Sequence, residues 1–229
     1  FLLKRESQKQ DNPTLHRAVT GIHSSARRLE KITDKIFKVL QSDTPELSLH
    51  PQQARIQDIL DDVAEVVAPF LNKRSQVLHL DCPDGLHMVL DIQMITDAVV
   101  NLVMNAIKFS PDEHAITVRA DLDKQDPSRV RIDVIDTGVG VNPEDFPRIF
   151  QTFFGTYDSK HHSSGDFEFE KRGIGLGLAI VKKFTELHGG EVAVVTERGR
   201  GSTFSISLPV FNPTESISAF PALVNRQRQ

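Results

Sequence analysis

The chain has 229 residues, a formal net charge of -4 and 39% hydrophobic residues, a composition typical of a soluble globular protein with one sizeable core. With a pI near 6.1 and no apolar run approaching the roughly 20 residues needed to cross a bilayer, it is expected to bind no nucleic acid and to span no membrane. Its single cysteine, Cys82, fits a reducing compartment, so we expect this fragment, which opens on FLLKRES without an initiator methionine, to be cytoplasmic, whether or not the intact protein is membrane-anchored.

The first periodic signal in the chain is a heptad pattern over residues 15–40. Its seam positions alternate spacings of four and three: Leu15, Val19, Ile22, Ala26, Leu29, Thr33, Ile36 and Leu40. This pattern predicts a long, coiled-coil-like helix, and favours a bundle or coiled-coil partner over packing on the helix's own domain. We therefore expect a homodimer that associates through this helix. The prolines of QSDTPELSLHP then indicate a domain boundary, which divides the chain into 1–45, 46–211 and a tail at 212–229.

Residues 46–211 alternate between the two kinds of regular pattern. In chain order they predict a helix at 56–72, strands at 76–82 and 86–90, a helix at 92–108, strands at 115–122 and 129–136, a helix from about 175 to 188, and a hairpin of GEVAVVTE and STFSISLP. Antiparallel neighbours dominate this order. It therefore predicts an α+β fold, a two-layer α/β sandwich in which one mixed sheet carries its helices on a single face.

Two asparagines interrupt the apolar helix that contains NLVMNAIKFS. Asn101 and Asn105 are four residues apart, so their side chains project from the same helix face. A buried amide without a partner costs on the order of a few kcal/mol. The pair therefore needs partners, which are either the neighbouring backbone or a ligand.

Two glycine clusters follow the asparagine helix. DTGVG ends a strand with Asp136, Gly138 and Gly140, and GIGLG opens a helix with Gly173, Gly175 and Gly177. Glycines admit a ligand close to the main chain, and the free N–H groups of a helix N-terminus suit phosphate. The second cluster is no dinucleotide fingerprint, because Leu178 stands where a glycine is needed, and no Walker loop, because the chain has no Gly-Lys pair. Taken alone, it is equally compatible with ordinary turn glycines.

The order of these motifs is more specific than any one of them. A helix with N-x-x-x-N-A-x-K-F is followed by D-x-G-x-G, by FPRIFQTFF, by the polar stretch 155–172, and by GIGLGLAIVKKF. Over about residues 52–209 this resembles the ATP-binding domain of sensor histidine kinases, in the GHKL group with type II topoisomerases, Hsp90 and MutL. The resemblance implies a Bergerat-type ATP-binding fold for 46–211. It also implies that 1–45 contains the second helix of a histidine-bearing dimerisation hairpin.

The resemblance assigns roles to the asparagine helix. Asn105 matches the residue that coordinates the Mg²⁺ bridging the triphosphate of ATP, and oxygen ligands shared with phosphates suit that ion. Asn101 would line the same site, directly or through water, unless both amides merely bond to neighbouring backbone. Lys108 would pair with phosphate as a catalytic group, or else be a solvated lysine. Phe109 would pack on the base, or else belong to the core.

The glycine clusters receive the remaining roles. Asp136 would accept a hydrogen bond from the adenine amino group, with the backbone of Gly138 and Gly140 against the base. The amides near Gly173, Gly175, Gly177 and Leu178 would hold the phosphates. A lid at 151–172 would close over them.

The resemblance also bears on the reaction. GHKL proteins that hydrolyse ATP carry a glutamate where this chain has Asn101, and a carboxamide is no general base at neutral pH. We therefore expect a histidine kinase that holds ATP for a histidine nucleophile and serves the receiver domain of a response regulator. Neither His16 nor His23 has the acid and proline of the family's H box, so the acceptor lies upstream or on another protein. The missing H box leaves open a nucleotide-gated interaction module without phosphoryl transfer; a hydrolase is the third alternative, which Asn101 disfavours.

Overall fold

The computed structural model describes residues 49–154 and 175–210. The predicted helix at 15–40, nearly all of the lid and the tail at 212–229 lie outside these ranges. Among the helices that are described, none combines the length and the apolar composition that crossing a bilayer requires.

A five-stranded mixed sheet forms one layer of the fold, with the strand order β2-β4-β5-β7-β6. Its strands are β2 Val77–Asp81, β4 Ala115–Leu122, β5 Arg129–Asp136, β6 Glu191–Glu197 and β7 Gly201–Pro209. The β2–β4 pair is parallel and the other three pairs are antiparallel. The mixed sheet predicted from the sequence is therefore confirmed.

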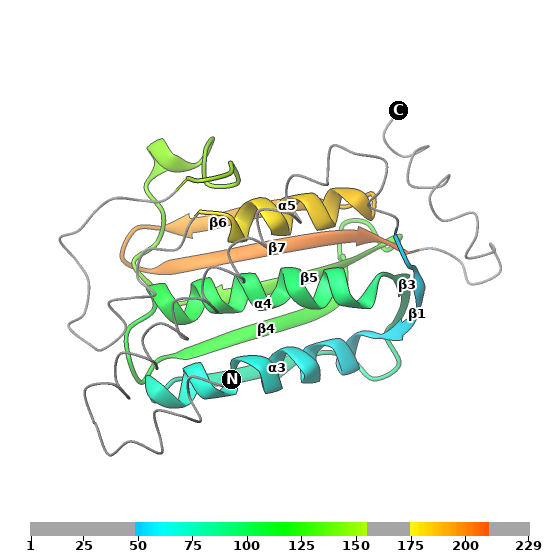
Figure 1. Ribbon diagram of the computed structural model, residues 1–229, viewed down its shortest axis with the longest axis horizontal. Helices are drawn as coiled ribbons and strands as arrows, with labels where there is room; N and C mark the ends of the chain where they lie inside the picture. Colours follow the sequence, from blue (N-terminus) through cyan, green and yellow to red (C-terminus); the bar gives the residue numbers. More distant parts are fainter. Residues whose placement is uncertain (1–48, 155–174, 211–229) are drawn as a thin grey trace, which may run out of the picture. The chain divides into compact units, whose positions relative to one another are not determined.

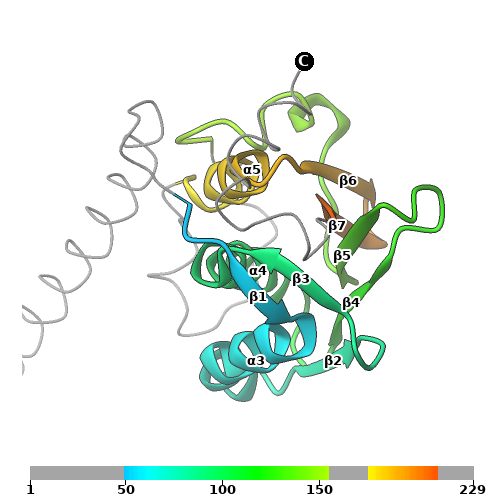
Figure 2. The same ribbon diagram turned by 90° about the vertical axis from the view of Figure 1, so that its right-hand side faces the viewer.

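Three helices form the second layer and cover one face of this sheet, as Figures 1 and 2 show. They are α3 Ile56–Lys73, α4 Ile92–Phe109 and α5 Gly177–Leu187, with α4 between the other two. The sheet residues that face them are apolar and fully buried in the central strand: Val130, Ile132 and Val134. The opposite face carries polar groups, among them Arg131 and Ser205, which both bond to the Asp133 carboxylate. Single-face coverage is thus confirmed as well.

A second, two-stranded sheet was not predicted from the sequence. It pairs β1 Gln52–Arg55 with β3 His87–Leu90 in antiparallel register. The segment QQAR contains one apolar residue, Ala54, and only that residue is buried. Such a short polar strand has no alternating pattern to detect. The strand expected at 86–90 does form, but its partner is β1 and not a strand of the main sheet.

Helix α4, which carries the two asparagines, has well-defined ends. At its start the Asp91 carboxylate accepts hydrogen bonds from the backbone N–H groups of Met94, at 3.1 Å, and His50, at 3.0 Å. At its end Ser110 is extended, with φ -85° and ψ 151°, because it precedes Pro111. The helix predicted at 92–108 is confirmed.

His188 joins the end of α5 to the start of α4. Its Nδ1 lies 2.6 Å from the Phe184 carbonyl oxygen, and its Nε2 lies 3.0 Å from the backbone nitrogen of Asp91. A carbonyl only accepts and a backbone N–H only donates, so the ring is neutral with its proton on Nδ1. Burial lowers the pKa of His188, against smaller opposing effects of the Phe184 hydrogen bond and the Asp91 charge.

This histidine should make the fold less stable in acid. Because the pKa of His188 is lower in the folded than in the unfolded chain, the unfolded state binds more protons below about pH 6.5. Its contribution to stability is complete above that pH and is lost as the pH falls towards the folded-state pKa. We expect His188→Gln to flatten the dependence of the unfolding free energy on pH between about 7.5 and 5.5, measured by urea denaturation. Equal slopes for the variant and the wild type would contradict this account.

Candidate functional site

Asn101 bridges α4 and the first turn of α5. Its Nδ2 donates to the backbone oxygen of Asp97, one turn earlier in α4, at 2.8 Å. Its Oδ1 faces the other helix, where a Cβ at Gly177 would lie 3.3 Å from that oxygen. The backbone-bonding alternative therefore describes the amino group of Asn101, while its oxygen is directed towards α5.

Asn105 is in a different situation one turn later. Its side chain is half-buried, and no residue in the described ranges hydrogen-bonds to it. A half-buried amide without a protein partner offers a neutral oxygen ligand, and binding to it breaks no hydrogen bond within the fold. This fits a hard cation such as Mg²⁺, which takes oxygen ligands and shares its coordination sphere with phosphates and water.

Lys108 supplies positive charge near the end of the same helix. Its Nζ lies 4.7 Å from the centroid of the Phe109 ring, and within the described part of the chain no carboxylate pairs with it. Burial lowers the pKa of the Lys108 ammonium. A partly desolvated cation without a counter-charge is a favourable position for an anionic ligand.

Asp136 presents one free carboxylate oxygen at the end of β5. Its Oδ1 accepts hydrogen bonds from the backbone N–H groups of Gly138, at 2.8 Å, and Ser202, at 3.2 Å. Its Oδ2 has no hydrogen-bond partner among the residues that the structure describes. Burial raises the pKa of this carboxyl group, and the two backbone hydrogen bonds oppose that rise. The free oxygen fits an exocyclic amino group of a nucleobase. Ser202 was missed from the sequence because it acts through its main chain, which leaves no side-chain signal.

The first glycine cluster is pressed against the end of α4. A Cβ at Gly138 would lie 2.5 Å from the Phe109 carbonyl oxygen and 2.8 Å from the Asp136 Oδ1, so no side chain fits there. The next residue, Val139, donates its N–H to the same Phe109 oxygen at 3.3 Å. Gly140 packs against the backbone of Glu197 in the β6–β7 turn. The turn that follows the Asp136 carboxylate is therefore held against the Phe109 backbone at the end of α4.

The second glycine cluster meets the phenylalanine-rich segment. Phe153 donates its N–H to the Gly175 carbonyl at 2.9 Å. Gly175 has φ +73°, and a Cβ there would lie 2.5 Å from the Phe154 oxygen, so glycine is required on both counts. Phe150 packs edge-to-face on Phe204 of β7, with ring centroids 6.5 Å apart. Phe153 and Gly175 are thus joined, and the phenylalanine-rich segment is anchored on the sheet through Phe150.

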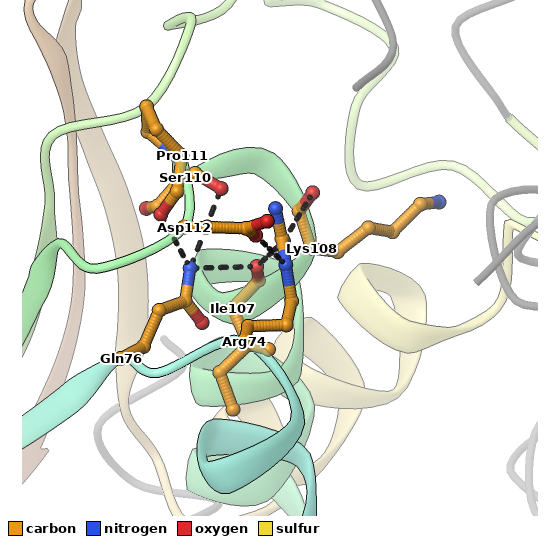
Figure 3. Close-up of polar contacts among 7 residues, drawn as sticks. All are labelled: Arg74, Gln76, Ile107, Lys108, Ser110, Pro111 and Asp112. Carbon is orange, nitrogen blue, oxygen red and sulfur yellow. Dashed lines mark hydrogen bonds and ion pairs between the residues drawn. The ribbon is translucent and has the colours of Figure 1, made fainter. Parts of the chain in front are cut away.

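The structure brings most of the predicted site residues into one neighbourhood along α4. Asn101 contacts the start of α5, and Phe109 contacts the Asp136 turn, with Asn105 and Lys108 between them. Leu178 is half-buried in the first turn of α5, and Gly173 lies outside the described residues. An amide oxygen can ligate a metal, an ammonium can bind an anion, and a buried carboxylate can accept a hydrogen bond from a nucleobase. Two further residues beneath α4, Arg74 and Gln76, were not predicted (Figure 3).

Two curated proteins are similar to this chain over most of its length. The non-motile and phage-resistance protein of Caulobacter vibrioides is 28% identical over 199 residues, which are 86% of this chain and 23% of that protein. The sensor-like histidine kinase SenX3 of Mycobacterium tuberculosis is 28% identical over 207 residues, 87% of this chain and 46% of SenX3. The chain thus spans less than half the length of either curated relative.

Two solved structures and a family model also match this chain. Full-length ShkA in complex with AMPPNP matches with a TM-score of 0.77 and 25% identity, over 91% of this chain and 41% of ShkA. Histidine kinase ThkA in complex with the response regulator TrrA matches in fold, with a TM-score of 0.65 and 22% identity, over 94% of this chain and 57% of ThkA. Residues 90–212, more than half of the chain, match the model described as histidine kinase-, DNA gyrase B-, and HSP90-like ATPase. The chain belongs to this family of ATPases.

Proposed function

We propose that this chain is the catalytic part of a histidine kinase in a two-component signalling system. It binds Mg·ATP and transfers the γ-phosphoryl group to a histidine outside this segment. The observation that carries the proposal is the carboxamide of Asn101, which stands in an ATPase-family site where hydrolysing members place a glutamate. Its amino group is bonded to the Asp97 oxygen, and it cannot take a proton from water at neutral pH.

Different residues of the site bind different parts of the nucleotide. The free Oδ2 of Asp136 accepts a hydrogen bond from the adenine amino group, and Phe109 packs on the base. The Lys108 ammonium and the amides at the start of α5, near Gly177 and Leu178, bind the phosphates. Asn105 fits Mg²⁺, whose charge when bound offsets that of the β- and γ-phosphates.

Transfer itself needs little covalent assistance from this chain. A nitrogen of the acceptor imidazole forms a bond to the γ-phosphorus while the bond from that phosphorus to the ADP oxygen breaks, and the imidazole releases its proton to solvent. Because a carboxamide, Asn101, stands where hydrolysing members have a glutamate to activate water, ATP waits until the histidine is positioned in line with the leaving oxygen. The phosphoryl group then passes to an aspartate of a receiver domain. The complex of ThkA with a response regulator supports this partner.

The remaining partners follow from the same proposal. The acceptor histidine lies on a dimerisation hairpin, of which residues 15–40 supply one helix, so the active form is a homodimer. The use of ATP and the single cysteine support a cytoplasmic location for this segment. The heptad seam at 15–40 supports the dimer.

A transfer assay tests the proposed function. The chain is incubated with γ-labelled ATP, Mg²⁺ and a hairpin domain carrying the upstream histidine, with a His→Gln hairpin as the matched control. We expect acid-labile, base-stable label on the intact hairpin only. Tight ATP binding without transfer would favour the nucleotide-gated interaction module. Rapid phosphate release without labelled hairpin would favour a hydrolase.

A further inference from the structure

The C-terminal end of α4 carries negative partial charge, which is unfavourable for binding phosphate at the site proposed above. The last four carbonyls of a helix have no partner within the helix, and they carry its negative dipole end, equivalent to about half an elementary charge. Here that end adjoins Lys108 and Phe109, where a triphosphate would bind. Turn residues take two of these carbonyls, because Ser110 donates to Ala106 and Val139 donates to Phe109.

The other two carbonyls belong to Ile107 and Lys108, and Arg74 binds both. The guanidinium donates through one nitrogen to the Ile107 oxygen and, at 3.3 Å, to the Lys108 oxygen. Its Nε bonds to the Asp112 Oδ1 at 2.6 Å. The Arg74 side chain is only 10% exposed, whereas that of Asp112 is 61% exposed. A desolvated positive charge therefore lies directly on the negative end of α4, and its counter-charge lies in solvent.

Gln76 completes this contact from the same connection between α3 and β2. Its Nε2 lies 2.8 Å from the Pro111 oxygen and 3.3 Å from the oxygens of Ile107 and Ser110. Its Oε1 is buried without a hydrogen-bond partner in the described part of the chain. A buried oxygen without a partner destabilises a fold. The Gln76 amide nevertheless keeps this orientation, in which its amino group faces the three carbonyl oxygens.

We infer that Arg74 is a positioning residue for nucleotide binding. It neutralises the negative end of α4 and fixes the backbone of Lys108. The Lys108 side chain extends away from Arg74, Gln76 and Asp112, as Figure 3 shows, so the guanidinium holds the main chain on one side while the ammonium is free to meet phosphate on the other. This inference rests on the proposed function and adds to it a residue that touches neither nucleotide nor metal.

The electrostatic role has a signature that a purely structural role lacks. A negative helix end repels a ligand in proportion to the ligand's charge, so the loss caused by removing Arg74 grows with the number of phosphates. If the role of Arg74 were purely structural, its removal would distort the site and weaken the binding of all three ligands equally. The affinities for ATP, ADP and adenosine therefore distinguish an electrostatic from a structural role.

The experiment measures these three affinities for the full chain by calorimetry. For Arg74→Gln we expect ATP affinity to fall about tenfold, ADP affinity to fall less and adenosine affinity to stay unchanged. Arg74→Lys, which keeps the charge, should restore most of the ATP affinity. Arg119→Gln is the matched control, because Arg119 also pairs with an aspartate, Asp81 at 2.8 Å, but is exposed, and its ion pair joins β4 to β2. It should change none of the affinities.

Three outcomes would overturn the inference. They are an equal loss for ATP and adenosine, no loss for either in Arg74→Gln, and no recovery in Arg74→Lys. If Arg74→Gln does not fold, Asp112→Asn is measured in its place. Removing the counter-charge of Arg74 should raise the affinity for ATP relative to that for adenosine. An unchanged ratio of the two affinities would overturn the inference. Failure of the wild type to bind ATP would instead refute the proposed function, and this inference with it.

Discussion

Asn105→Ala is expected to lower Mg²⁺-dependent ATP affinity by about 100-fold and to leave the fold intact. The asymmetry follows from the contacts of the side chain. No described residue hydrogen-bonds to Asn105, so its removal deprives the folded chain of no polar interaction. The bound nucleotide, by contrast, loses the protein oxygen that we assign to its metal ion. Titrations with ATP in the presence of Mg²⁺ and of a chelator, together with urea denaturation of the free chain, measure both effects.

A matched control separates this effect from a general change in α4. Gln93 also carries a carboxamide on α4, but it is exposed and bonds to the Asp97 side chain at 3.2 Å. Gln93→Ala should leave ATP affinity unchanged. Asn101→Ala should differ from both, because it removes a hydrogen bond within α4 and a contact with α5, and so should lower stability. Wild-type ATP affinity in Asn105→Ala, with Mg²⁺ present, would sink the assignment of the metal ligand.

Local patterns predicted the elements that carry the site. The strands expected at 115–122 and 129–136 form at those residues, because buried side chains alternate with more accessible ones along most of β4 and all of β5. The asparagine helix ends within one residue of its expected end, since the proline at 111 forces the preceding residue out of helical geometry. Signals of this kind are contained within a few residues of the chain.

Contacts between distant segments were not predictable in the same way. Arg74 meets the Ile107 carbonyl 33 residues later, and Ser202 meets Asp136 across 66 residues. Both contacts involve a main-chain atom. Main-chain atoms are the same in nearly every residue, so the sequence does not mark which of them makes a contact. A lysine or arginine at the end of a helix is common on general dipole grounds, so nothing in KRSQ distinguished Arg74 from a solvated residue.

The structure also separates residues that the motif treats alike. Asn101 and Asn105 are equivalent members of one sequence pattern, yet only the first is bonded to backbone. The two oxygens of Asp136 likewise differ, because one accepts two backbone N–H groups and the other accepts none from the described residues. The atoms left without partners are the ones a ligand can use, and the sequence alone does not identify them.

This difference between the oxygens of Asp136 predicts a reversal of base selectivity. In Asp136→Asn, the side-chain oxygen must occupy the Oδ1 position, because the N–H groups of Gly138 and Ser202 donate to it. The new amino group then points where the carboxylate accepted a hydrogen bond. It meets the amino group of adenine as donor against donor, but meets the carbonyl oxygen of guanine as donor against acceptor. We expect ATP affinity to fall about 100-fold and GTP affinity to rise about tenfold.

Competition titrations of ATP and GTP against the variant and the wild type measure this reversal. Asp133→Asn serves as the control, since Asp133 lies in the same strand but bonds to Arg131 and Ser205 on the opposite face of the sheet. It should leave the ratio of ATP to GTP affinity unchanged. An equal loss of both nucleotides in Asp136→Asn would mean that the carboxylate only organises the turn. A shift of the ratio towards GTP requires that Oδ2 faces the base, because no other atom of this side chain is available to read it.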